Sequence, residues 1–497
     1  MKPIVKNVLV IGAGIMGAGI AQVAAQAGHR VRLYDSCDGA ARDAKHKLAA
    51  TFDTLVAKGK LEAEAAQATL ARIEPIDMLA EARDCALVVE AIVENLEIKR
   101  DLLRQLESVV ASDCVLATNT SSISVTALAN GLAHPQRLVG MHFFNPVPLM
   151  KLVEVVSGLH TDAAVAEQVF ALSQAWGKVP VHAKSTPGFI VNRIARPFYA
   201  ETLALLQEQA ASPQVLDACL KAAGFRMGPC ELMDLIGHDT NFAVTRSVYE
   251  ANFFDKRYVP SLVQRDLVDG GLLGRKSGRG FYRYGEGQAL PSLLTASREA
   301  PTAARELIVH GEGAIADWLA RAHPTRERSS NWVGLTVDGA RLVLSDGRPA
   351  RALAAAMGTN DVAVFDRPLL LPAAPGTALA YALAPDASDH WRAQAPAWLA
   401  AMGFAPQRVA DAPGLVVART VAMLINEAAD AVLQGVCSPE AADAAMKLGL
   451  NYPAGPFEWL AQWDRDEVIA VLEALDAEYR GERYRISPWL RRGRAAA

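Results

Sequence analysis

The stretch NVLVIGAGIMGAGIAQVAAQAG, residues 7–28, joins a short apolar run to a glycine-rich turn and a second run with helical spacing. Gly12, Gly14 and Gly17 match the pattern GxGxxG. The first glycine permits a tight turn, the second lets a pyrophosphate approach the backbone, and the third lets helix and strand pack closely. The N–H groups at the helix start then face the phosphates. This stretch predicts a dinucleotide-binding βαβ unit.

The next apolar run, HRVRLYD (29–35), ends in Asp35. An acidic residue about twenty positions after such a turn accepts a hydrogen bond from the ribose 2′-hydroxyl and would repel a 2′-phosphate. The sequence therefore predicts NAD, rather than NADP, as the cofactor.

Apolar runs and helical patterns then alternate as far as residue 185. Strands are expected at CALVVEAI (85–92), CVLATNT (114–120), RLVGMHFF (137–144), LVEVVSG (152–158) and KVPVHAKS (178–185), with helices between most of them. One long helical region, 37–71, interrupts this order. Alternating strands and helices predict a doubly wound parallel sheet of the Rossmann type, with ligands at the carboxyl ends of its strands.

The remainder of the chain contains an internal repeat. TPGFIVNR (186–193) aligns with APGLVVAR (412–419), so that Ala418 stands where the first copy has Asn192. Between the copies, after a polar linker at Glu286 to Pro301, HGEGAIA keeps Gly311 and Gly313 but has Ala316 at the third position. We expect four domains: a nucleotide-binding domain (1–185), an all-helical domain (186–286), a reduced Rossmann-like domain without catalysis (302–408), and a second, non-catalytic helical domain (409–497).

Composition excludes several classes of protein. The 497 residues carry a net charge of −4 and are 51% hydrophobic, which does not favour nucleic acid as a partner. The six cysteines form no CxxC pair and no metal-ligand spacing. The chain has no apolar run of about twenty residues that could span a membrane. We expect a cytoplasmic protein with free thiols and no bound metal.

Four polar side chains near segment ends suggest chemistry. They are Ser121 in TNTSS (118–122), His142 in GMHFFNPVP, Glu154 in LVEVV and Asn192 in TPGFIVNR. Histidine is the usual base for removing a hydroxyl proton, a carboxylate can fix its tautomer, and a hydroxyl and an amide can hold the substrate oxygen. The structural alternatives are a helix cap for TNTSS and a polar strand end for the histidine. A hydrolase is disfavoured because no GxSxG elbow follows a strand.

Several of these stretches together resemble one family. GAGIMGAGIAQVAA, VVEAIVEN, NTSSIS, GMHFFNPVPLMKLVEVV and TPGFIVNRI are similar to the signature segments of the 3-hydroxyacyl-CoA dehydrogenases, over about the first 285 residues. The resemblance implies oxidation of a (3S)-3-hydroxyacyl-CoA to a 3-oxoacyl-CoA, with hydride transfer to NAD.

The resemblance also implies roles for single residues. His142 matches the catalytic histidine, Glu154 its carboxylate partner, and Ser121 and Asn192 the groups that contact the reacting oxygen. Positions that match cofactor contacts are Asp35, Glu94, Lys99, Ser121, Asn145 and Lys276. Lys58 matches a lysine that contacts coenzyme A, and Thr51 stands where the family often has a serine with that role.

The long form of the chain resembles the 3-hydroxyadipyl-CoA dehydrogenases of phenylacetate breakdown. Arg196 follows Asn192 by four positions, which predicts that both lie on one helix face. A bidentate pair between Arg196 and the free carboxylate of a dicarboxyl substrate would then be within reach. The alternative is that Arg196 pairs with a nearby acidic residue or points to solvent.

Three other functions stay open at this stage. They are a 3-hydroxybutyryl-CoA or general short-chain 3-hydroxyacyl-CoA dehydrogenase, an NAD-dependent dehydrogenase of a free hydroxy acid, and an NAD-binding protein without activity. Dependence on coenzyme A separates the first from the second, and the intact pair His142 and Glu154 argues against the third. Association into a homo-oligomer is also left open.

Overall fold

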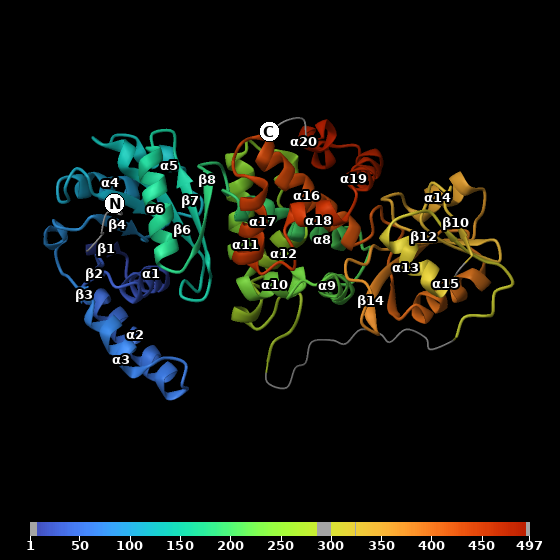
Figure 1. The fold of residues 1–497 in the computed structure, drawn as a ribbon, viewed down its shortest axis with the longest axis horizontal. Helices are drawn as coiled ribbons and strands as arrows, with labels where there is room; N and C mark the ends of the chain where they lie inside the picture. Colours follow the sequence, from blue (N-terminus) through green and yellow to red (C-terminus); the bar gives the residue numbers. More distant parts are fainter. Residues whose placement is uncertain (1–6, 286–299, 324, 494–497) are drawn as a thin grey trace. The chain divides into compact units, whose positions relative to one another are not determined.

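The computed structural model describes residues 7–285, 300–323 and 325–493, which form two compact units (Figure 1). The first unit is Met1–Arg193 with Gln434–Leu450, and the second is Ile194–Leu433 with Asn451–Ala497. The linker expected at Glu286 to Pro301 lies, apart from its last two residues, outside the described ranges. Within those ranges every helix is too short or too polar to cross a lipid bilayer.

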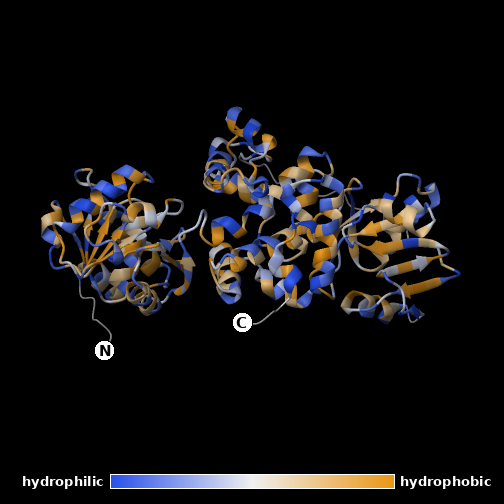
Figure 2. Cartoon of the chain, turned by 90° about the horizontal axis from the view of Figure 1, so that it is seen from above, coloured by the Kyte–Doolittle hydropathy of each residue, from blue (hydrophilic) through white to orange (hydrophobic). Residues whose placement is uncertain are grey.

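The first unit is built on an eight-stranded sheet with the order β3-β2-β1-β4-β5-β6-β7-β8. Its strands are β1 Asn7–Ile11, β2 Arg30–Tyr34, β3 Ile73–Pro75, β4 Leu87–Glu90, β5 Val115–Thr118, β6 Leu138–Phe143, β7 Leu152–Ser157 and β8 Val179–Lys184. Helices α1 Ile15–Gln26, α4 Leu96–Glu107, α5 Val125–Ala129 and α6 Ala163–Ala175 connect them. The strands are largely orange in Figure 2, as expected for strands that are buried on both faces. The predicted Rossmann-type fold is confirmed.

Two strands, β7 and β8, run against the predicted direction. β7 is antiparallel to β6, whereas β8 is again parallel to β7, so the sheet is mixed rather than wholly parallel. Residues 144–151, which join β6 to β7, are too few for the helical crossover that a parallel neighbour requires. The resulting register places His142 directly opposite Glu154.

The long helical region expected at 37–71 is divided into α2 Ala40–Ala57 and α3 Ala63–Ala71, which pack on each other beside β3 (Figure 1). Gly59 lies between them with φ +64°, a left-handed conformation that turns the chain back.

The helix expected to carry both Asn192 and Arg196 is also interrupted. α7 Val191–Ile194 is followed by Ala195 in a turn and then by α8 Arg196–Gln207. Pro197 lacks the N–H that would bond to the carbonyl of Arg193, and its ring crowds that carbonyl. Asn192 and Arg196 therefore stand in separate helices, and a shared helix face no longer supports the pairing of these two side chains.

The second unit contains most of both helical copies. The helices of the first copy are α8, α9 Pro213–Ala222, α10 Pro229–Ile236, α11 His238–Ala251 and α12 Leu262–Asp269, and those of the second are α16 Val417–Leu433, α18 Pro456–Gln462, α19 Arg465–Tyr479 and α20 Pro488–Arg492. α8 packs on α16. Between these helices Arg419 Nε donates to Glu201 Oε2 at 2.6 Å, and both side chains are fully buried.

The reduced Rossmann-like segment forms a seven-stranded mixed sheet with the order β10-β9-β11-β12-β13-β14-β15. Its strands are β9 Leu307–His310, β10 Arg326–Glu327, β11 Gly334–Val337, β12 Ala340–Leu344, β13 Val362–Phe365, β14 Thr377–Leu383 and β15 Phe404–Arg408, and its helices are α13 Ala314–Ala322, α14 Ala350–Met357 and α15 Asp389–Ala401. The strand β9, which precedes the glycine turn, has an antiparallel neighbour, β11, whereas β1 of the first sheet has two parallel ones. The backbone oxygen of Trp332 lies 2.5 Å from where a Cβ on Gly311 would be. The glycine turn of this segment is therefore closely packed at its first position.

A buried carboxylate joins this sheet to the second helical copy. Asp366, which follows β13, is fully buried. Its two oxygens accept hydrogen bonds from the backbone N–H groups of Arg367, Val416, Val417 and Ala418 at 2.7–2.9 Å. Asp366 thus provides an acceptor for N–H groups at the start of α16, which have no partner within the helix itself.

We predict that Asp366→Ala lowers the free energy of unfolding by roughly 2–5 kcal/mol, because several buried N–H groups lose their acceptor. The urea midpoint, followed by tryptophan fluorescence, measures this effect. Asp386→Ala, at an exposed position of the same segment, is the control and should leave the midpoint unchanged. Equal midpoints for the two variants would contradict the role given to Asp366.

Candidate active site

The centre of the site is a buried pair of side chains on adjacent strands. His142, the last residue but one of β6, is 6% exposed, and Glu154 of β7 is 0% exposed. Nδ1 of the imidazole lies 2.6 Å from Glu154 Oε2. Because a carboxylate oxygen can only accept, Nδ1 carries the proton and Nε2 is left as an acceptor. This geometry gives the imidazole the tautomer that a general base requires.

The second oxygen of Glu154 holds the turn that precedes Asn192. Oε1 accepts from the backbone N–H groups of Ile190 and Val191 at 3.0 and 2.9 Å. Phe189, just before them, has φ +47°, which is unusual for a bulky residue, and its ring packs edge-on against His142 at 5.8 Å between centroids. One carboxylate therefore fixes both the imidazole and the backbone that carries the amide.

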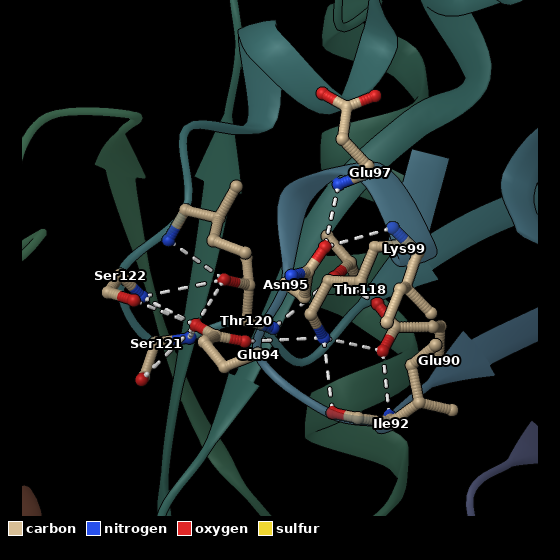
Figure 3. Close-up of polar contacts among 12 residues, drawn as sticks. Glu90, Ile92, Glu94, Asn95, Glu97, Lys99, Thr118, Thr120, Ser121 and Ser122 are labelled. Atoms are coloured by element: carbon tan, nitrogen blue, oxygen red, sulfur yellow. Dashed lines mark hydrogen bonds and ion pairs between the residues drawn. The ribbon is translucent and has the colours of Figure 1, made fainter. Parts of the chain in front are cut away.

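Asn192 connects this pair to the turn after β5. Its Nδ2 lies 3.5 Å from the backbone oxygen of Ser121. Glu94 Oε1 in turn accepts from the backbone N–H groups of Ser121 and Ser122, from Ser122 Oγ, and from Thr120 Oγ1 at 2.6 Å (Figure 3). The structure thus brings Glu94, Ser121 and Asn192 together, in the unit that contains His142 and Glu154.

Lys99 lies behind Glu94 rather than at the surface. Its side chain is 1% exposed, and its Nζ lies 2.6 Å from Glu90 Oε1 and 3.3 Å from Glu94 Oε2 (Figure 3). Burial by itself would raise the pKa of Glu94, but the Lys99 ammonium and the hydrogen bonds from Thr120 and the serine turn outweigh it and lower that pKa. Glu94 is therefore held as a charged acceptor, and in this conformation Lys99 acts on the site through it.

The glycine turn fits a dinucleotide. A Cβ on Gly12, where φ is +99°, would come within 2.4 Å of the Ala91 backbone oxygen, and one on Gly17 within 1.7 Å of the Gly12 oxygen. A Cβ on Gly14 would meet nothing within 4 Å, which leaves open space where a pyrophosphate approaches. This turn lies at the point where the strand order reverses between β1 and β4. These residues fit NAD.

Asp35 follows β2 beside this turn. Its Oδ2 accepts from Ala13 N–H at 2.6 Å, and its Oδ1 accepts from Cys37 N–H at 2.9 Å. The carboxylate therefore holds the middle of the GxGxxG turn.

The other predicted site residues lie on several different elements. Asn145 is exposed just after β6, Lys58 is exposed at the end of α2, and Thr51 Oγ1 donates to the Lys47 carbonyl within that helix. In the second unit, Lys276 pairs with Asp239 at 2.5 Å and is 46% exposed. Arg196 is 5% exposed, donates to Thr245 Oγ1 at 3.0 Å and lies over the Tyr199 ring.

Two residues of the first unit were missed in the sequence. Glu90 accepts from Lys99, from the Ile92 N–H and, through Oε2, from Thr118 Oγ1 at 2.7 Å. Lys178 donates to the carbonyls of Val147 and Met150 and thereby fixes the loop after His142. For Glu90 the signal was a charged residue at the end of an otherwise apolar strand.

A dinucleotide fold with a buried histidine–carboxylate pair and a nearby amide defines a dehydrogenase of hydroxyl substrates. Family models match along the chain: "3-hydroxyacyl-CoA dehydrogenase, NAD binding domain" at residues 7–186, its "C-terminal domain" at 188–284 and 414–496, and "3-hydroxybutyryl-CoA dehydrogenase reduced Rossmann-fold domain" at 342–413. The chain belongs to the 3-hydroxyacyl-CoA dehydrogenase family and is an NAD-dependent enzyme of that type.

Similar proteins span both the long and the short forms. The chain is 45% identical, over 98% of its length and 97% of the relative's, to 3-hydroxyadipyl-CoA dehydrogenase of Escherichia coli K12. The human mitochondrial hydroxyacyl-coenzyme A dehydrogenase is 40% identical over 57% of this chain and 92% of its own length. A crystal structure described as 3-hydroxybutyryl-CoA dehydrogenase of E. coli K12 superposes with a TM-score of 0.89 at 43% identity, covering 98% of each chain.

We predict that NAD is preferred over NADP by orders of magnitude in kcat/KM and that Asp35→Ala narrows this preference, because the carboxylate repels a 2′-phosphate. Asp35→Asn is the matched variant, since it keeps an oxygen that can accept from Ala13 while removing the charge. Both variants should gain relative activity with NADP. Equal rates with the two cofactors in the unmodified enzyme would contradict the assignment of Asp35.

Proposed function

We propose that His142 is the general base that removes the proton from the C3 hydroxyl of the substrate. The observation that carries this role is the 2.6 Å contact between His142 Nδ1 and the fully buried Glu154, which leaves Nε2 as the acceptor. Glu154 stabilises the imidazolium that forms when the proton arrives. NAD, when bound, accepts the hydride that leaves C3.

Asn192 and Ser121 hold the reacting oxygen in this proposal. The amide nitrogen of Asn192 is close to the Ser121 backbone, so both side chains belong to one cluster. Hydrogen bonds from an amide and a hydroxyl polarise a carbonyl in the reverse reaction and position the alcohol in the forward one. Glu94 keeps the serine turn in place and, with Asp35, Asn145 and Lys276, contributes to cofactor binding. Lys58 contacts the phosphates of coenzyme A.

His142→Ala is predicted to lower kcat by roughly 10²–10⁴-fold, the usual contribution of a general base, while NAD binding stays nearly intact. Glu154→Gln should also slow turnover, because the imidazolium loses its charged partner. NADH absorbance gives the rate, and cofactor fluorescence titration gives the affinity. Turnover of His142→Ala at the original rate would rule out this mechanism.

The substrate we propose is 3-hydroxyadipyl-CoA, oxidised to 3-oxoadipyl-CoA in phenylacetate breakdown. The support is the similarity over nearly the full chain to a protein described as 3-hydroxyadipyl-CoA dehydrogenase, together with Arg196. Arg196 is a buried guanidinium, and it lines a cavity of about 80 Å³ with Tyr199, Thr245 and Gln264. A carboxylate is a natural partner for such a group. The similar structure described as a 3-hydroxybutyryl-CoA dehydrogenase supports the short-chain alternative.

Arg196→Leu is predicted to lower kcat/KM for 3-hydroxyadipyl-CoA by about tenfold to a hundredfold, the equivalent of a lost charge-assisted pair. The rate with 3-hydroxybutyryl-CoA should change little, because that chain has no second carboxylate. Arg246→Leu, at a position where the side chain is 58% exposed, is the control and should affect neither substrate. An equal loss on both substrates would remove Arg196 from the recognition of the carboxylate.

A further inference from the structure

Part of the second helical copy belongs to the unit that carries the active site. Residues Gln434–Leu450 group with Met1–Arg193, whereas the rest of the copy groups with the second unit. Their helix, α17 Pro439–Leu450, packs on β7 and on the edge strand β8. Just before it, the Val436 carbonyl accepts from the Lys184 N–H at 2.9 Å, at the end of β8.

The buried face of α17 is made of small residues and one methionine. Its members are Ala442, Ala445, Met446 and Gly449, a spacing that forms one helix face. A Cβ on Gly449 would lie 2.8 Å from Leu152 Cδ2 and 3.1 Å from Val191 Cγ2, closer than ordinary contacts. The helix therefore lies so close to these two side chains that a residue larger than glycine would require a shift of the helix or of its neighbours.

Both of these side chains adjoin the catalytic carboxylate. Leu152 begins β7, two residues before Glu154, and the Val191 N–H donates to Glu154 Oε1. Gly449 thus packs against the strand that presents Glu154 and against the turn that Glu154 holds.

A second contact reaches the residue after Asn192. Arg193 is 3% exposed, and its Nη1 donates to Gln434 Oε1 at 2.8 Å. Since Asn192 and Arg193 share α7, a fixed position for the guanidinium restricts the rotation of this short helix and hence the direction of the amide.

We propose that residues 434–450 of the second helical copy are a positioning element of the active site, in which Gln434 orients Asn192 through Arg193 and Gly449 sets the place of Glu154 and its turn. The copy that has Ala418 in place of the amide therefore still contributes to catalysis, by holding the groups of the first copy. This inference rests on the roles proposed above for Glu154 and Asn192.

The test uses the full-length enzyme with two series of variants. Gln434→Leu removes the acceptor for Arg193, and Gln434→Glu keeps one. Gly449→Ala and Gly449→Val introduce side chains of increasing size that overlap with Leu152 and Val191. We expect kcat to fall by about tenfold to a hundredfold in Gln434→Leu and Gly449→Val, since a displacement of about 1 Å of a positioned group can cost that much. Gln434→Glu should have a kcat near that of the unmodified enzyme, and the kcat of Gly449→Ala should lie between those of the unmodified enzyme and Gly449→Val.

A readout beyond activity separates positioning from a loss of folded protein. If the chemical step is slowed, the deuterium isotope effect on kcat with 3-deuterated substrate rises, while KM for NAD and the melting temperature stay near those of the unmodified enzyme. Loss of folded enzyme would lower the apparent kcat without changing the isotope effect. Controls are Gln462→Leu and Ala461→Val, at two exposed positions at the end of α18 and outside residues 434–450.

The outcomes distinguish this inference from the proposed function. If His142→Ala abolishes turnover and both Gln434→Leu and Gly449→Val retain normal kcat and isotope effects, the positioning role is wrong and the catalytic assignment stands. If His142→Ala retains turnover, the catalytic assignment itself is wrong. Equal losses in the variants and in the two controls would also overturn the positioning role.

Discussion

The carboxylate of Glu154 is the constraint on which the rest of the site depends. It is fully buried, and it accepts from one imidazole nitrogen and from two backbone N–H groups. A buried charge is costly unless it is hydrogen-bonded, so these three donors are as necessary to the carboxylate as the carboxylate is to them. The antiparallel register of β6 and β7 brings the imidazole to it, and the turn at Phe189 brings the N–H groups.

A comparison of the two helical copies distinguishes the residues that the fold requires from those that the reaction requires. The second copy keeps a residue in the left-handed conformation before its first helix, Leu415 with φ +48°, where the first copy has Phe189 with φ +47°. It also keeps a buried carboxylate, Asp366, which accepts hydrogen bonds from the backbone N–H groups that follow. This carboxylate comes from the end of β13, a strand with a parallel and an antiparallel neighbour like those of β6. The copy lacks an amide at Ala418. A carboxylate at this helix start is therefore a structural requirement, whereas the imidazole and the amide serve the chemistry.

Much of the first unit could be predicted because its signals are local. The GxGxxG turn, the apolar strands and the polar residues beside them are each fixed by a few neighbouring positions. The direction of β7 could have been inferred from the short connection 144–151, but the regular alternation of strands and helices favoured a parallel sheet. The break at Ala195 follows from Pro197, because a proline disrupts the helical turn before it even where the apolar pattern continues.

Contacts between segments that are distant along the chain could not be predicted from the sequence. Gln434 and Arg193 are 241 positions apart, and an internal repeat suggests that each copy folds as a body of its own. Residues 434–450 of the second copy group with the first unit, where Gly449 packs closely against β7. No local sequence pattern indicates this contact. The burial of Lys99 could likewise not be inferred from the sequence, because its partner Glu90 lies on another element.

The most direct test of the central claim is the protonation of the His142 ring. In protein with ¹⁵N-labelled histidine, assigned with the help of His142→Ala, the ring shifts at neutral pH should show a proton on Nδ1 and none on Nε2. That result is expected if Glu154 is an ionised acceptor that holds the base ready for the substrate. A proton on Nε2 with a bare Nδ1 would contradict the account.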